Sequence, residues 1–171
     1  AYNYSMSSNY NRIPRPAVSA KDTRRLLDVL GRGASARDKA LIVCCLGLGL
    51  RISEACFIRL RDIRFTPRTI TVKVVGKGLV SREVQSSGER VRGWVLGRVR
   101  EIEEIHDKDS GEQLLVGLRQ SYASQLIHNW GMQAGIPDLH PHRLRRTYGQ
   151  IRRKAGVSLE VVAREMGHSR L

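Results

Sequence analysis

The 171-residue chain has few aromatic residues and no long apolar run. Aromatic side chains make up 5% of the sequence, which disfavours a protein that binds single strands by stacking bases on exposed rings. The longest apolar stretch, ALIVCCLGLGL at residues 40–50, is too short to span a bilayer and is followed by an arginine. The first ten residues lack the apolar core of a signal peptide. We therefore expect no transmembrane helix and no membrane partner.

Cysteine is scarce as well, and its placement limits the chemistry that it can serve. Cys44, Cys45 and Cys56 lie in apolar stretches of helical pattern, without the spacing of a metal-binding motif. We expect them to be buried free thiols in a protein of a reducing compartment. The sequence predicts neither a metal site nor a cofactor.

Acidic residues are outnumbered by basic ones. Thirty Lys and Arg face sixteen Asp and Glu, which gives a net charge of +14 at pH 7. This excess is larger than solubility requires and indicates a polyanionic partner. Because exposed rings for base stacking are few, we predict that the partner is double-stranded DNA.

The chain divides into a leading segment and one domain. Residues 1–18 are polar at first and then contain two prolines in NRIPRPAV, which predicts a flexible tail and a linker. Residues 19–171 are long enough for a single domain with its own core.

The apolar pattern predicts a mainly helical α+β fold. Ser19 with Asp22 and Ser35 with Asp38 form N-cap patterns for two helices, and the second, through about residue 48, is apolar on most sides. Further helices are expected at residues 52–59, 89–105, 121–134, 141–155 and 158–166, with a loop at 106–112. Alternating residues at 69–75 and 80–85 predict a small antiparallel sheet, a hairpin with Lys77 at its turn.

Two clusters of basic residues are candidates for a functional site. His142 and Arg145 are three residues apart on an expected helix, so they share a face and can bind one small anion. The alternative is a solvated basic face, because neighbouring arginines crowd the same segment. Arg51 follows a buried helix, in a position suited to bidentate recognition of a phosphate.

Three stretches together resemble one known family. GLRISEACFIRLRDI, VVGKGLVSREV and HPHRLRRTYGQIRRKAGVSLEVVAREMGHS occur in the order and approximate spacing of the catalytic domain of tyrosine recombinases, the phage integrases and Xer-type recombinases. The resemblance covers roughly residues 19–169. The resemblance implies the fold of that catalytic domain. It also implies site-specific cleavage and rejoining of DNA through a 3′-phosphotyrosine bond, without a metal ion or a nucleotide.

The resemblance also implies the roles of individual residues. The catalytic residues of the family correspond here to Arg51, Lys77, His142, Arg145 and His168. The family's supporting glutamate corresponds to Glu54. Two arginines can stabilise charge on a phosphodiester under attack, a lysine can protonate the leaving oxygen, and histidines can exchange protons near neutral pH. The alternatives are an exposed turn lysine for Lys77 and a helix cap for His168. We also assign DNA binding to five arginines: Arg82, Arg143, Arg146, Arg152 and Arg153.

The family's nucleophilic tyrosine is implied about nine residues beyond His168, and therefore beyond residue 171. We expect Tyr148 to pack inward with Leu144 and Ile151 rather than to serve as the nucleophile. The chain is therefore expected to be a C-terminally truncated fragment that is inactive alone. Where the family has LRHTF this chain has LRRTY, and VQSSG in place of the usual strand end predicts a short or frayed return strand.

The resemblance implies a homotetramer on DNA for the full-length protein, a monomer for this fragment, and a cytoplasmic or nucleoid location, with a viral or plasmid gene as one origin. Two alternatives stay open. One is a DNA-binding regulator or architectural protein without catalysis, and the other is a type IB topoisomerase, which shares the chemistry but not the strand exchange.

Overall fold

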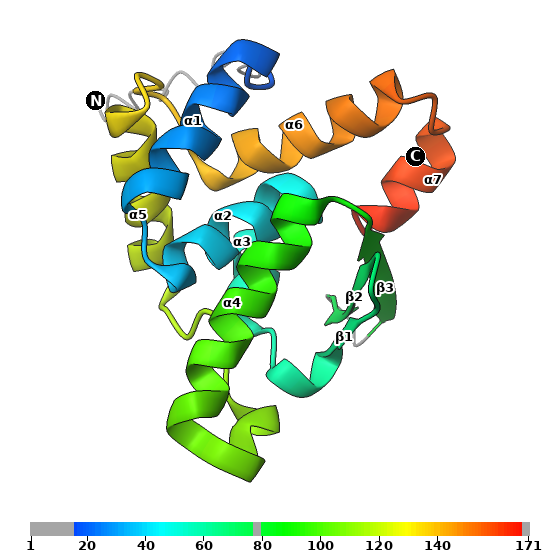
Figure 1. Ribbon diagram of the computed structural model, residues 1–171. Helices are drawn as coiled ribbons and strands as arrows, with labels where there is room; N and C mark the ends of the chain where they lie inside the picture. The colour runs from blue at the N-terminus through cyan, green and yellow to red at the C-terminus, as the bar shows by residue number, and fades with distance from the viewer. Residues whose placement is uncertain (1–15, 77–79, 169–171) are drawn as a thin grey trace, which may run out of the picture.

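The computed structural model describes residues 16–76 and 80–168, and it is mainly helical with one small sheet (Figure 1). The α-helices are α1 (Ala20–Gly33), α2 (Ala36–Gly47), α3 (Ile52–Phe57), α4 (Glu89–His106), α5 (Gln120–Gln133), α6 (Pro141–Lys154) and α7 (Leu159–Glu165). The described residues also form the 3₁₀ helices η1 (Leu60–Asp62) and η3 (Asp107–Glu112). The predicted α+β class is confirmed.

The first two helices begin at the residues that the sequence indicates. The Ser19 hydroxyl accepts a hydrogen bond from the Asp22 amide at 3.0 Å, and the Ser35 hydroxyl accepts one from the Asp38 amide at 3.2 Å. Each cap satisfies an amide that has no partner within its own helix. Ser158 caps α7 in the same way.

Helix α2 is the centre of the core. Its residues from Ala40 to Leu46 are buried, and it packs against α4 and α6 and also contacts α1, α3 and α5 (Figure 1). Cys44 and Cys45 on α2 and Cys56 on α3 are buried free thiols, as predicted. Burial and the neighbouring Cys56 raise the pKa of Cys44 to about 12, so this thiol stays protonated.

The sheet has three antiparallel strands in the order β1–β2–β3, and it lies on the side of the molecule away from α5 (Figure 1). Strand β2 (Ile70–Val75) and strand β3 (Ser81–Ser86) pair along six residues, from Ile70 with Ser86 to Val75 with Ser81. The expectation of a frayed return strand is therefore wrong, because every residue of β3 has a partner on β2. Lys77, expected at the turn, lies outside the described residues.

Two local elements differ from the sequence prediction. Strand β1 (Ile63–Phe65) was not predicted, since three residues are too few to show an alternating pattern. It is fixed instead by its pairing with Ile70 to Val72 of β2. The loop expected at residues 106–112 is the last residue of α4 followed by the 3₁₀ helix η3, whose turns are too short to give an apolar period.

The chain just before α1 is held against α6. Val18 is buried, and its amide donates a 2.8 Å hydrogen bond to the Thr147 hydroxyl. Arg143 donates to the carbonyl oxygen of Pro16 at 2.9 Å. This contact joins the entrance of the domain to the helix that carries His142 and Arg145. Within residues 16–76 and 80–168, no helix has the length and apolarity needed to cross a membrane.

Candidate active site

The turn between α2 and α3 sets the position of Arg51. Gly49 adopts a φ of +65°, and an added Cβ there would lie 2.4 Å from Cδ1 of the Tyr148 ring, so glycine is required on both grounds. Arg51 then forms the N-cap of α3, and its amide donates to the Glu54 carboxylate at 2.8 Å. The backbone of Arg51 is therefore fixed by the helix that follows it.

Helix α6 supplies the second pair of residues. Pro141 occupies its first turn, where the missing amide of proline costs no hydrogen bond, and His142 and Arg145 follow three residues apart. His142 is exposed, whereas Arg145 is buried. The Arg145 guanidinium donates to the carbonyl oxygens of Gly49 and Met166, which connects α6 to the α2–α3 turn and to the end of α7.

His168 follows the end of α7. Gly167 has a φ of +67° and donates to the carbonyl oxygen of Arg164, and the His168 amide donates to that of Ala163 at 2.9 Å. These two bonds form the Schellman motif that ends many helices. The backbone of His168 is thus placed by the geometry of the helix end.

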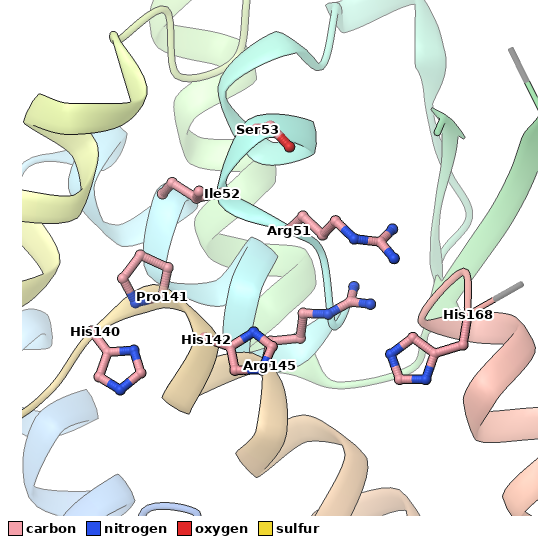
Figure 2. A pocket seen from close by; sticks show the side chains of 8 residues that line it. All are labelled: Arg51, Ile52, Ser53, His140, Pro141, His142, Arg145 and His168. Carbon is pink, nitrogen blue, oxygen red and sulfur yellow. The ribbon is translucent and has the colours of Figure 1, made fainter. Parts of the chain in front are cut away.

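These three segments meet around one pocket of about 460 Å³. Its lining residues are Arg51, Ile52, Ser53, His140, Pro141, His142, Arg145 and His168. Figure 2 shows the guanidinium groups of Arg51 and Arg145 extending in the direction of His168, with the His142 ring next to Arg145. The structure therefore brings together four of the five predicted catalytic residues, and the fifth, Lys77, is outside the described residues.

Glu54 supplies negative charge behind these cations. Its carboxylate, 5% exposed, accepts from Arg51 at 3.0 Å and from both terminal nitrogens of Arg82 at 2.8 and 2.9 Å, and it lies 3.9 Å from Arg145. Burial alone would raise the pKa of Glu54, but the bonds from Arg82 and from the Arg51 amide lower it. Glu54 is therefore ionised at neutral pH.

The charged neighbours also shift the pKa values of the pocket residues. Although both side chains are exposed, loss of water on the side of each ring that faces the protein, followed by the charges of nearby arginines, lowers the pKa of His142 and of His168. Burial and the charge of Arg51 lower the pKa of Arg145 to about 10, so it still carries its proton at neutral pH. The pocket therefore combines fixed cations with two neutral imidazoles that can donate or accept hydrogen bonds.

Tyr148 does not line the pocket. It is buried in a small cluster with Val162 and Met166, and its hydroxyl donates to the Glu165 carboxylate at 2.8 Å. Burial, together with the bond to Glu165, raises the pKa of Tyr148. The prediction that the ring packs inward is confirmed, but Ile151 is exposed, so the expectation that it shares a buried stripe with Tyr148 is wrong. The cluster on α7 covers Tyr148 and leaves Ile151 in solvent.

Arg82, Arg143 and Arg152, which we assigned to DNA binding, have carboxylate partners within the protein. Arg82 binds Glu54, Arg143 binds Asp138, and Arg152 donates to both oxygens of Glu165. Arg153 is exposed. A second pocket of about 750 Å³ shares Arg51 and Ser53 with the first and is also lined by Arg59, Arg61, Lys73 and Gly76. The basic surface thus continues from the pocket toward the β2–β3 turn.

Sequence reasoning did not predict Ser53 and His140 as pocket residues, nor Arg82 as the partner of Glu54. Ser53 lies two residues after Arg51 and His140 two before His142, so proximity in the sequence could have indicated both. Within the described part of the chain, no three His, Cys, Asp or Glu side chains are placed to hold a metal ion.

Comparison with known proteins identifies the family. A sequence profile of the phage integrase family matches residues 17–171. The chain is 30% identical to tyrosine recombinase XerC of Mycobacterium sp. (strain KMS), over 91% of this chain and 56% of that protein. It is 26% identical to tyrosine recombinase XerA of Thermococcus kodakarensis, over 94% of this chain and 57% of that protein. The chain therefore spans about half the length of these relatives.

Solved structures have the same fold. XerA recombinase aligns with a TM-score of 0.79 at 18% identity, over 91% of this chain and 57% of that one. XerH recombinase bound to its difH substrate in a pre-cleavage complex aligns with a TM-score of 0.75 at 19% identity, over 91% of this chain and 48% of that one. The integrase from mycobacterium phage Brujita aligns with a TM-score of 0.69 at 28% identity, over 94% of this chain and 52% of that one. The chain belongs to the phage integrase family, the tyrosine recombinases.

Proposed function

We propose that this chain is the catalytic domain of a site-specific DNA recombinase and that the pocket holds the scissile phosphate. One observation carries the proposal: Arg51, Arg145, His142 and His168 come from three separate segments and line one pocket. The family relationship supports it, since the matched relatives are named tyrosine recombinases and XerH was solved on its DNA substrate.

The roles of the residues follow from the charge that develops during phosphoryl transfer. Arg51 and Arg145 stabilise the negative charge on the non-bridging oxygens of the phosphate, and Glu54 holds Arg51 in position for this task. His142 and His168 donate hydrogen bonds to the phosphate or exchange a proton with the attacking hydroxyl. Lys77 protonates the 5′ oxygen as it leaves, and Gly76, the residue before it, lines the pocket that shares Arg51.

The nucleophile in this proposal is a tyrosine other than Tyr148, supplied from beyond residue 171 in the same polypeptide or from a neighbouring subunit. Full-length subunits assemble as a tetramer on paired DNA sites, and the 171-residue chain is a monomer in solution. The reaction takes place where the DNA is, in the cytoplasm or nucleoid.

The proposal is tested first by the salt dependence of duplex binding. The logarithm of the binding constant should fall with the logarithm of salt concentration, with a slope of about −0.9 for each phosphate contact. Arg51→Gln and Arg145→Gln should each reduce that slope by about 0.9. Arg64→Gln is the matched control, because Arg64 is an exposed arginine of β1 paired with Glu83. Salt-independent binding, or pocket variants that behave like the control, would contradict the proposal.

A second candidate is a DNA-binding regulator without catalysis. The positions of the two tyrosines in the described part of the chain favour it. Tyr148 is bound to Glu165, and neither Tyr148 nor Tyr122 lines the pocket. An assay with two labelled DNA sites and the complete gene product separates the candidates. Exchange between the sites indicates the recombinase, relaxation of supercoils without exchange indicates a type IB topoisomerase, and binding alone indicates the regulator.

A further inference from the structure

Three arginines donate to three consecutive carbonyl oxygens at the end of α7. Arg82 donates to the carbonyl of Glu165 at 2.8 Å, Arg145 to that of Met166, and Arg51 to that of Gly167 at 3.0 Å. These carbonyls lie at the negative end of the helix dipole, where cations are favourable. Arg51 and Arg145 line the pocket, whereas Arg82 does not.

Arg82 joins elements that are far apart in the sequence. It lies on β3, its two terminal nitrogens bind the two carboxylate oxygens of Glu54 on α3, and its third nitrogen binds the last residue of α7. Its side chain is 13% exposed. An added Cβ at Gly167 would lie 2.8 Å from a terminal nitrogen of Arg82, so the guanidinium is packed directly against the residue before His168.

We propose that Arg82 is a positioning residue that sets the placement of Arg51, through Glu54, and of His168, through the carbonyl end of α7. It links the β2–β3 hairpin to both sides of the phosphate pocket and does not itself contact DNA. This inference rests on the proposed function, because it concerns how that pocket is arranged.

The shape of the guanidinium is essential to this role. Arginine offers donors in a planar fork, and here all three of its nitrogens have protein partners in different directions. A lysine keeps the charge but offers one nitrogen, which cannot reach both oxygens of Glu54 in fork geometry and the Glu165 carbonyl as well. Charge and positioning can therefore be separated by comparing Arg82→Lys with Arg82→Gln.

The experiment uses the 171-residue chain with isotope-labelled histidines. The pKa values of His142 and His168 are measured by NMR with and without a short DNA duplex, together with the binding constant as a function of salt. In the wild type, a phosphate in the pocket should raise both pKa values, because an anion favours the protonated ring. Arg64→Gln, which removes a cation from the same sheet, is the control.

In both Arg82 variants we expect the DNA-induced rise to be largely lost for His168 and retained for His142. The salt slope should stay unchanged, because Arg51 keeps its charge beside the phosphate and its own bonds to Glu54 and the Gly167 carbonyl, whereas loss of a phosphate contact would reduce the slope by about 0.9. A reduced slope would make Arg82 a DNA contact and overturn the inference, and so would an Arg82→Lys variant that responds like the wild type. Failure of both variants to fold, seen by circular dichroism, would make Arg82 purely structural. If DNA shifts neither histidine in the wild type, the proposed function fails instead.

Discussion

Glu54 places one carboxylate among the guanidinium groups of Arg51, Arg82 and Arg145. Because the carboxylate is buried and ionised, its removal leaves these cations close together without their counter-charge. Removing a buried counter-charge lowers the free energy of unfolding far more than removing an exposed one, because water cannot take the place of the lost partner.

We predict that Glu54→Gln lowers the free energy of unfolding by about 3 kcal/mol at pH 7, measured by urea denaturation. The folded-state pKa of Glu54 lies below its ordinary value of 4.5. Its contribution is therefore fully present above pH 4.5 and is lost as the pH falls through the lower folded-state pKa. The difference between wild type and variant should shrink over that acidic window.

Glu83→Gln is the control for this prediction. Glu83 forms an ion pair with Arg64 on the same sheet, but its side chain is 52% exposed, so its loss should cost about 0–1 kcal/mol. Equal effects of the two substitutions would mean that the buried network does not stabilise the fold.

The catalytic candidates and the supporting Glu54 could be predicted residue by residue, whereas the role of Arg82 as the partner of Glu54 could not. Arg51, His142, Arg145 and His168 lie within short motifs, and a motif can be recognised without knowing the fold. Arg82 and Glu54 are 28 positions apart, and the Arg82–Glu165 bond spans 83 positions. Nothing in the local sequence indicates such a pair.

The turn that joins α2 to α3 depends on one glycine. Gly49 has a φ of +65°, and its backbone lies against the buried ring of Tyr148 on α6. The turn thereby fixes both the direction of Arg51 and the distance between α6 and the core.

Gly49→Ala should destabilise the chain by more than about 1 kcal/mol, because alanine is strained at positive φ and its methyl group would overlap the Tyr148 ring. Thermal unfolding followed by circular dichroism measures the effect. Gly97→Ala is the matched control: Gly97 is in α4 with nothing within 4 Å of an added Cβ, so the change should stabilise by about 0.5–1 kcal/mol. An unchanged melting temperature for Gly49→Ala would show that the turn tolerates a side chain.

Elements with a local determinant were predictable, and those fixed by distant contacts were not. Ser19 and Ser35 cap their helices within the next turn, so the sequence alone locates both helix starts. Strand β1 exists because Ile63 to Phe65 pair with β2, and the sequence of three residues does not reveal that partner. Ile151 is exposed because it takes no part in the cluster that Tyr148 forms with Val162 and Met166, a contact that the sequence of α6 alone does not reveal.

DNA binding by the whole molecule should depend on pH, because the two pocket histidines can gain charge when a phosphate binds. The net charge is +14 with neutral histidines, and the lowered pKa values keep His142 and His168 uncharged at pH 7 in the free chain. A bound phosphate favours their protonated forms. Binding and protonation are therefore coupled, and each strengthens the other.

We predict that duplex affinity rises as the pH falls through 6.5, by at most about tenfold per pH unit for each proton taken up. The stability of the chain without DNA should change in the opposite direction and fall as the pH falls. A lowered pKa means that stability is full above pH 6.5 and declines as the pH falls through the folded-state values. Calorimetry in two buffers of different ionisation enthalpy measures the protons taken up on binding.

The substitutions His142→Gln and His168→Gln should each reduce this proton uptake. His128→Gln serves as the control, since His128 is on α5 and does not line the pocket. Uptake that persists when both pocket histidines are replaced would place the coupled protons elsewhere in the molecule.

The burial of the three thiols has a practical consequence. Cys44, Cys45 and Cys56 all lie in the core, and burial raises their pKa values, so a folded molecule offers neither access nor a reactive thiolate to an alkylating reagent. A single cysteine introduced on the surface would therefore react alone, and a fluorophore could be attached near the pocket with the native core left intact.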